Sequence, residues 1–321
     1  MSRLMMQLRV VLGRLWRIDA PLTATALLMF ALLGVFGAGL VLDPRLIQGA
    51  PLWLKPAKFA LSIGVYCTTM VWLFGFIPDQ VRTRRVVGSL TVAGMLLEMG
   101  IIGAQAARGT TSHFNVSTPL NAVLFAVMGV GIVVQTLTSV ALAVALFRQR
   151  FEDGALGWAV RFGMVITIAG ALLGGLMTRP TEAQLAQLSA GHGSVAGAHT
   201  IGAPDGGPGM AGTGWSREHG DVRVPHFMGL HAMQLLPLLA LASRRLRASR
   251  AQRARLVLSL AGSYLGLFGI LLWQALRGQS LLAPDARTAT ALLGWAALSV
   301  VLGWASVRRS GASHEASVVV A

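Results

Sequence analysis

Residues 119–147 read PLNAVLFAVMGVGIVVQTLTSVALAVALF and carry no charged side chain. About 20 apolar residues in a helix cross the hydrocarbon core of a bilayer, so this stretch is long enough to span one. Seven further apolar runs of similar length lie along the chain, at 20–42, 59–78, 86–107, 155–178, 225–243, 256–276 and 288–307. Lipid offers the backbone no hydrogen-bond partners, and these runs are too long and unbroken for barrel strands. They therefore predict an all-α, polytopic transmembrane helix bundle of about eight spans.

The composition also indicates a membrane protein. Of the 321 residues, 54% are hydrophobic and only 12% are charged, which is about half the charged fraction of a soluble domain. The net charge of +15 would suggest a nucleic-acid partner in a soluble protein. Here the basic residues lie in short clusters between apolar runs, so we expect the lipid bilayer, and no nucleic acid, as the partner. The single cysteine, Cys67, excludes a disulfide within the chain.

The arginines predict the orientation of the chain in the membrane. Most of them lie before the first apolar run and in every second connection after it, including the dense cluster at 244–255. Because basic residues are retained on the cytoplasmic side, this bias predicts cytoplasmic N- and C-termini and an even number of spans.

Five segments follow from this reading. Residues 1–19 are expected to form a cytoplasmic amphipathic helix, since leucines and Val11 share one face between arginines. Spans one to five occupy 20–178, a Gly-rich outer loop occupies 179–224, spans six to eight occupy 225–307, and a cytoplasmic tail occupies 308–321. The loop begins with a capping-box sequence, Thr181 to Gln184, and its histidines 192, 199 and 219 are expected to be solvated. Two Gly-x-x-x-Gly pairs, at 170 and 174 and at 262 and 266, predict close helix packing.

Polar residues in the second and third spans call for an explanation. Glu98 is the only acid well inside an apolar run, roughly 15 Å below the outer end of its helix. Gln105 lies on the same helical face, and Arg108, His113 and Asn115 follow in the sequence RGTTSHFN. The only two lysines, Lys55 and Lys58, stand together at the start of the second span. Interfacial snorkelling explains such lysines as readily as function does.

The sixth span begins with a second polar group. The sequence GDVRVPHFMGLHAMQLLP contains Asp221, Arg223, His226, His231 and Gln234, followed by Pro237. His231 and Gln234 are three residues apart and share a helical face. Pro237 removes one helix hydrogen bond and is expected to kink the helix just below that face.

In the predicted orientation, these polar residues all fall in the outer half of the membrane or in outer loops. They predict one outward-facing site that draws on the second, third and sixth spans. We expect Glu98, His231, Lys58 and His113 to act as catalytic acid–base groups. The expected substrate-binding residues are Gln105, Arg108, Asn115, Arg223 and Gln234. Such a site favours a membrane-embedded enzyme, or a cofactor- or metal-binding protein, acting on a lipid-like or isoprenoid small molecule.

Other interpretations remain open from the sequence. A metal ion would be held by His226, His231 and Asp221, although the two histidines are five residues apart and do not share a helical face. A haem b would use His231 as its best-placed ligand. A secondary transporter or channel needs a polar path to the inner side, for which Gln135 and Pro237 are modest support. A non-catalytic sensor or assembly subunit would use the loop 179–224 as its partner surface.

Three segments carry a resemblance to a known family. WLKPAKF, QAARGTTSHFN and GDVRVPHFMGLHAMQLLPL are similar to motifs of an uncharacterised family of bacterial multi-pass membrane proteins. The resemblance implies a location in the bacterial plasma (inner) membrane. It implies no particular reaction.

Overall fold

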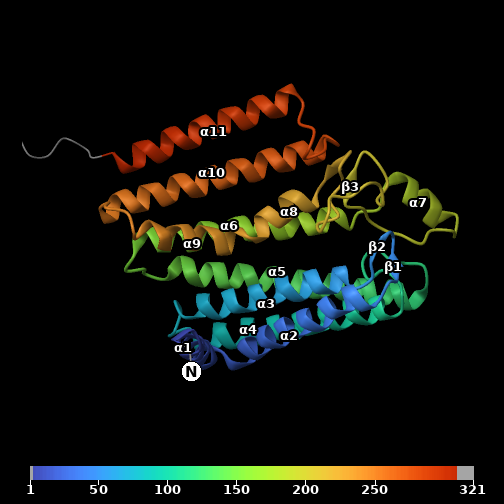
Figure 1. The fold of residues 1–321 in the computed structure, drawn as a ribbon, viewed down its shortest axis with the longest axis horizontal. Helices are drawn as coiled ribbons and strands as arrows, with labels where there is room; N and C mark the ends of the chain where they lie inside the picture. The colour runs from blue at the N-terminus through green and yellow to red at the C-terminus, as the bar shows by residue number, and fades with distance from the viewer. Residues whose placement is uncertain (1–2, 309–321) are drawn as a thin grey trace, which may run out of the picture.

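The computed structural model describes residues 3–308 and is a bundle of long helices (Figure 1). Seven helices are long and apolar enough to cross a membrane: α2 (Ala20–Leu42), α3 (Leu54–Phe74), α4 (Val81–Ala107), α5 (Pro119–Arg148), α6 (Gly154–Met177), α10 (Arg250–Leu276) and α11 (Ala286–Val307). Two shorter helices, α8 (Arg223–Leu230) and α9 (Ala232–Ser243), meet at an angle of 46° and are together long and apolar enough to count as an eighth. The prediction of an all-α, multi-pass membrane protein is confirmed. The predicted tail lies outside the described residues, except for Arg308.

The two ends of the bundle differ. One end, the strand end, carries two small antiparallel pairs, β1 (Leu46–Ile47) with β2 (Ala50–Pro51) and β3 (Thr200–Ile201) with β4 (Gly220–Asp221). The short helix α7 (Glu182–Ser189) also lies there (Figure 1). The opposite end, the α1 end, carries α1 (Arg3–Ile18), which contacts α2 and α3.

Three helices, α3, α4 and α10, begin five or six residues earlier than the hydropathy predicts. The second apolar run was expected to start at 59, but α3 starts at Leu54, so Lys55 and Lys58 both lie in its first turns. The third was expected at 86, but α4 starts at Val81 and places Arg84 in its first turn. Hydropathy marks only the lipid-crossing part of a helix, whereas the backbone hydrogen bonds continue into the polar boundary. The two lysines are therefore held by a helix and not by a loop.

The bend between α8 and α9 lies at His231, so the prediction that Pro237 would mark the kink is wrong. The Met233 N–H donates to the Thr167 hydroxyl at 3.1 Å, and that hydroxyl lies 3.3 Å from the carbonyl oxygens of Gly229 and Leu230. Thr167 belongs to α6 and is buried. Its hydroxyl thus satisfies backbone groups that the break leaves without their helical partners.

Close backbone contact fixes α8 on α6. A Cβ atom built on Gly170 would lie 2.6 Å from the Gly229 Cα, and one on Gly174 would lie 3.5 Å from the His226 ring. The first Gly-x-x-x-Gly pair therefore packs as predicted. In the second pair, Gly262 has no neighbouring atom within 4 Å, so the prediction is wrong for that glycine, although Gly266 packs against Trp295.

Two loops cover the strand end together. The Val116 N–H donates to the Ser194 carbonyl at 3.0 Å, and the Ala196 N–H donates to the Phe114 carbonyl at 2.9 Å. The capping box at Thr181 is present as expected. The expectation of solvated loop histidines is wrong for His199, whose ring packs on Phe114 and whose Nδ1 lies 2.8 Å from an Asp205 oxygen. The Gly-rich loop is folded onto the loop 108–118 that follows α4.

Candidate functional site

Three basic side chains gather at the strand end. Lys55 and Lys58 of α3 both interact electrostatically with Arg223 at the start of α8. The Lys58 ammonium donates to the Thr213 carbonyl at 3.0 Å, so the Gly-rich loop reaches α3. We call Lys55, Lys58 and Arg223 the cation cluster. It joins the second and sixth predicted spans, although their sequences are far apart.

Arg223 is fixed by a buried acid. Asp221 is only 3% exposed, and the Arg223 guanidinium donates to both of its oxygens, at 2.9 Å from Nε and 2.6 Å from Nη2. Arg223 also donates to the Gly214 carbonyl at 2.7 Å. The bidentate pair neutralises one positive charge of the cluster and aligns the guanidinium. Lys55 and Lys58 have no carboxylate within ion-pair distance among residues 3–308.

Glu98 lies in the bundle below the cation cluster. Its side chain is 2% exposed, and neither carboxylate oxygen has a hydrogen-bond partner. Lys55 is the charged residue that interacts with it, across a separation too long for a direct ion pair. A buried carboxylate without hydrogen bonds is costly, and in a membrane span such groups mark functional sites by default. Lys55 and Glu98 thus link the second and third predicted spans.

Two glycines make room for Glu98 and for Gln135. A Cβ atom on Gly131 of α5 would lie 3.7 Å from a Glu98 oxygen, and one on Gly94 of α4 would lie 4.0 Å from the Gln135 Oε1. Each helix therefore presents a glycine and, one turn later, a long polar side chain. Because α4 and α5 run antiparallel, the glycine of each helix faces the polar side chain of the other. We call this arrangement the reciprocal packing of α4 and α5.

A polar network continues from Gln135 toward the α1 end. The Gln135 amide donates to the Tyr66 hydroxyl at 2.7 Å and to the Thr138 hydroxyl at 3.1 Å, and the Tyr66 and Ser139 hydroxyls lie 3.2 Å apart. The Gln135 Oε1 and the buried Thr91 hydroxyl have no partner. The sequence reading overlooked Tyr66, Thr138 and Ser139 because single hydroxyls do not interrupt an apolar run. The spacing of Gly94 and Glu98, repeated at Gly131 and Gln135, was the available signal.

His113 lies beside the cation cluster, in the loop between α4 and α5. Its Nδ1 is 3.1 Å from the Ser112 hydroxyl, and its ring is tilted against Phe59 at 5.6 Å between centroids. Burial and the nearby charges of Lys55 and His199 hold the pKa of His113 well below its usual value of 6.5. The imidazole is therefore neutral at physiological pH and can accept a proton only in a much more acidic medium.

The other predicted residues of the third span organise the loop that carries His113. The Gln105 amide donates to the Thr111 carbonyl at 3.2 Å and to the Asn121 Oδ1 at 3.0 Å, while Arg108 donates to Gln105. Asn115 donates to the Thr111 carbonyl and accepts from Ser117. Gln105 and Asn115 are buried, and Arg108 is exposed. The side chains of Gln105 and Asn115 therefore stabilise the loop.

The histidines of the sixth span face different neighbours. The Nδ1 of His226 lies 2.8 Å from the Gly170 carbonyl, so His226 joins α8 to α6. The His231 ring packs on the Phe227 ring, with 4.2 Å between the ring centroids. Gln234 donates to the Thr69 hydroxyl of α3 at 3.3 Å, and its Oε1 has no partner. Gln234 thus ties the sixth predicted span to the second at a level deeper than the cation cluster.

The proposed metal ligands Asp221, His226 and His231 do not form a ligand set. Asp221 is occupied by Arg223 and by the Ser216 N–H, and His226 is bonded to Gly170. Between residues 3 and 308, no group of three His, Cys, Asp or Glu side chains is arranged to hold a metal ion. The structure instead brings together Lys55, Lys58, Glu98, His113 and Arg223.

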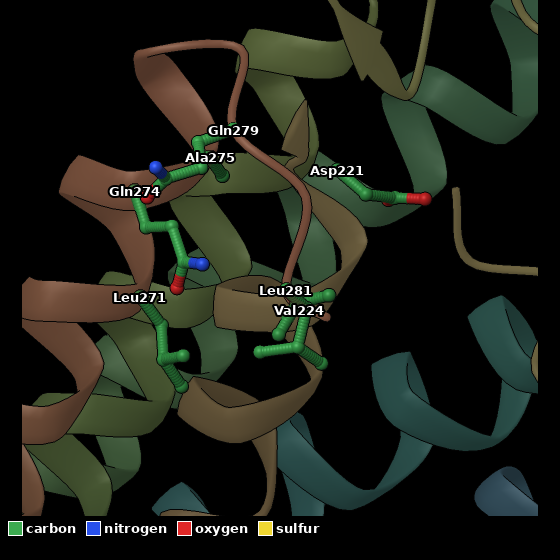
Figure 2. A pocket seen from close by; sticks show the side chains of 7 residues that line it. All are labelled: Asp221, Val224, Leu271, Gln274, Ala275, Gln279 and Leu281. Carbon is green, nitrogen blue, oxygen red and sulfur yellow. The ribbon is translucent and has the colours of Figure 1, made fainter. Parts of the chain in front are cut away.

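A small cavity lies near this site between α8 and α10. Figure 2 shows Leu271 and Gln274 of α10 on one side and Val224 and Leu281 on the other, with the Asp221 carboxylate pointing away. Its volume of about 10 Å³ is close to that of one water molecule. This cavity is too small for a substrate.

Comparison of the chain with protein-family models, with curated proteins and with solved structures yields no match.

Proposed function

We propose that this membrane protein is an enzyme embedded in the bacterial inner membrane that binds an anionic, lipid-like substrate at the strand end. The cation cluster would hold the anionic group, and Glu98 would act as the acid–base group. The observation that carries the proposal is the position of the cation cluster above a buried carboxylate that has no hydrogen-bond partner. In the proposed orientation the strand end faces outward.

The charges of the cluster support an anionic ligand. Two lysines and an arginine that repel one another are unfavourable unless an anion or a carboxylate lies among them. Asp221 compensates Arg223, but Lys58 is held only by a backbone carbonyl. A phosphate or carboxylate group would accept charge-assisted hydrogen bonds from both lysines. An apolar tail attached to that group would lie along the lipid-facing side of the bundle.

The geometry of Glu98 supports a role in proton transfer. A general base must be free to reach the proton that it abstracts, and the two Glu98 oxygens are not engaged by the protein. Lys55 interacts with both Glu98 and His113. It would orient a substrate group between the cation cluster and Glu98. His113 would remain neutral and hydrogen-bond the substrate.

Binding of a matched lipid pair tests the proposal. Purified full-length protein should bind a polyprenyl phosphate in preference to the uncharged polyprenyl alcohol, measured as the rise in Tm with ligand concentration. Substituting both lysines, Lys55→Met and Lys58→Met, should weaken phosphate binding by at least about 10- to 100-fold, which is the loss expected for each charge-assisted hydrogen bond removed. Arg217→Gln, an exposed charge at the same end, is the matched control.

A separate measurement tests the role of Glu98. Glu98→Gln should retain binding of the polyprenyl phosphate and lose conversion of lipid substrates presented as a membrane extract, followed by mass spectrometry. Equal Tm shifts with the phosphate and the alcohol would refute the anionic ligand. Unchanged conversion by Glu98→Gln would refute the acid–base role.

One observation favours a second candidate, a proton- or cation-coupled transporter. Polar groups continue past Glu98 through Gln135, Tyr66 and Ser139, and the two Glu98 oxygens and the Gln135 Oε1 have no partner. Such a series extends the polar path that a transporter requires. Proteoliposomes with a pH-sensitive dye distinguish the two candidates, because a transporter would carry protons in the absence of lipid substrate and Gln135→Leu would stop that movement.

A further inference from the structure

A second cavity, remote from the cation cluster, lies at the α1 end. Its volume is about 300 Å³, at the lower limit for small-molecule sites. The wall is formed by the end of α1, the start of α2 and the first two turns of α4: Ile18, Asp19, Ala20, Pro21, Val81, Arg84, Arg85, Gly88 and Ser89. Because Val81, Arg85 and Ser89 are exposed, the cavity opens at the surface of the bundle.

The charges in this wall are of both signs. Arg84 and Arg85 contribute two guanidinium groups, and neither forms an ion pair with an acid in the described part of the chain. The Nε of Arg84 is buried and has no hydrogen-bond partner. Asp19 lies opposite, with its Oδ1 accepting from the Leu22 N–H at 2.9 Å and its Oδ2 directed at Gly88.

The start of α4 adds to the attraction for an anion. Its N-cap residue, Gln80, makes no side-chain capping bond. The first N–H groups of a helix without a cap are free donors, and the helix dipole favours a negative charge beside them. Arg84, whose Nε is buried, and Val81, the first residue of α4, both line this cavity. Together they suit one phosphate group.

The helix α1 places the cavity at the level of lipid headgroups. Large apolar side chains of α1 are exposed, among them Leu8, Val11, Leu12 and Trp16, while Arg9 and Arg14 lie between them. A helix of this kind lies in the membrane interface with its apolar side chains toward the acyl chains. The cavity begins where α1 ends, at Ile18, so its opening faces the headgroup layer.

We infer that this cavity binds the headgroup of a phospholipid that carries both a phosphate and a primary ammonium group. Arg84 and Arg85 hold the phosphate, and Asp19 accepts hydrogen bonds from the ammonium. A headgroup with phosphate alone offers no donor to the Oδ2 of Asp19. A trimethylated ammonium has no N–H to donate.

The Tm of purified full-length protein in detergent, measured by tryptophan fluorescence with added lipid, tests the inference. Phosphatidylethanolamine should raise the Tm at lower concentration than phosphatidylglycerol or phosphatidylcholine. The double variant Arg84→Gln, Arg85→Gln should need about 10-fold more phosphatidylethanolamine for the same rise. Arg82→Gln, an exposed arginine of the same helical turn outside the cavity wall, should behave like the wild type.

Asp19→Asn separates the ammonium from the phosphate. Asparagine caps a helix as well as aspartate does, so α2 should remain intact. This variant should lose the preference for phosphatidylethanolamine over phosphatidylglycerol while retaining phosphatidylglycerol binding. If the double variant does not fold, Arg85→Gln alone replaces it, since Arg85 is exposed.

Three results would overturn the inference. The first is an equal response to the three lipids in the wild type. The second is an unchanged response of the double variant, or of Arg85→Gln where that variant replaces it. The third is a rise in Tm with free O-phosphorylethanolamine equal to that with phosphatidylethanolamine, which would assign the cavity to a soluble ligand instead of a lipid.

Discussion

Glu98 is a carboxylic acid among buried side chains, with only the more distant Lys55 to balance its charge. If its role is catalytic, the protein keeps a destabilising group for the sake of function. We expect Glu98→Met, which is apolar and similar in size, to raise the free energy of unfolding by about 1–3 kcal/mol, because the unpaired oxygens are removed. Thermal unfolding in detergent measures this, with the exposed Leu96→Met as the control. A lower Tm for Glu98→Met would mean that the Lys55–Glu98 interaction is structural.

Protonation of His113 makes the stability of the strand end depend on pH. Its pKa is well below 6.5 in the folded protein, chiefly because of burial. Below about pH 6.5 the unfolded chain binds a proton that the folded chain does not, so stability is lost as the pH falls through that value. We expect the Tm to drop between about pH 7.5 and 5.5, and to drop less in His113→Gln. His192→Gln, an exposed loop residue, should follow the wild type; an equal drop in His113→Gln would contradict the assignment.

The Asp205–His199 contact affects stability at a lower pH than His113 does. Burial alone would raise the pKa of Asp205, but hydrogen bonds from the His199 side chain and from backbone N–H groups of His199 and Thr200 hold it well below its usual value of 3.8. Because a depressed carboxyl pKa stabilises the fold above the unfolded-state value, this contribution is lost only below about pH 4. The effect of His113 can therefore be measured separately.

Among the elements, the break between α8 and α9 depends on one hydroxyl of α6. Thr167→Val keeps the shape of the side chain and removes the partner of the Met233 N–H. An unpaired buried backbone group costs about 1–3 kcal/mol, so we expect a loss of stability of that size. Thr167→Ser retains the hydroxyl and should stay near the wild type. Equal Tm values for the valine and serine variants would show that the bend does not need this bond.

The two glycine pairs provide a comparison between helices. In Gly170→Ala the new methyl would lie 2.6 Å from the Gly229 Cα, closer than van der Waals contact permits, and this backbone cannot move away without separating α6 from α8. Gly262→Ala meets no atom within 4 Å and should be neutral or gain up to about 1 kcal/mol from the better helix propensity of alanine. Thermal unfolding of both variants tests the contrast, and a stable Gly170→Ala protein would contradict the close contact.

The spans could be predicted from the sequence because lipid requires long apolar helices, and the eight apolar runs correspond to seven long helices and the bent pair α8–α9. The second span interacts electrostatically with the third through Lys55 and Glu98 and with the sixth through Lys58 and Arg223, and Gln234 of the sixth span donates to Thr69 of the second. The sequence does not reveal which polar groups bond locally. Asp221 and His226 looked like metal ligands, yet nearby groups already occupy them, because hydrogen-bond pairing is decided by tertiary contacts.

For the molecule as a whole, the orientation in the membrane is the property to measure. We predict that the strand end faces outward and the α1 end faces the cytoplasm. Cys67 is buried, so single cysteines can be added without replacing it. Ser117→Cys, exposed at the strand end, should react with a membrane-impermeant maleimide in intact cells. Arg247→Cys, exposed at the α1 end, should react only after lysis; the reverse pattern would invert the proposed topology and place the cation cluster on the cytoplasmic side.

The reciprocal packing of α4 and α5 has a consequence for how these helices can move. Sliding one helix past the other by a single turn, about 5.4 Å, would set Glu98 and Gln135 against each other in one direction and leave facing glycines with a void in the other. Either displacement would be unfavourable, so the packing of this pair allows only one register between α4 and α5. We therefore expect α4 and α5 to move together as one rigid body. Any motion that carries a substrate or an ion past Glu98 would then come from the helices around this pair.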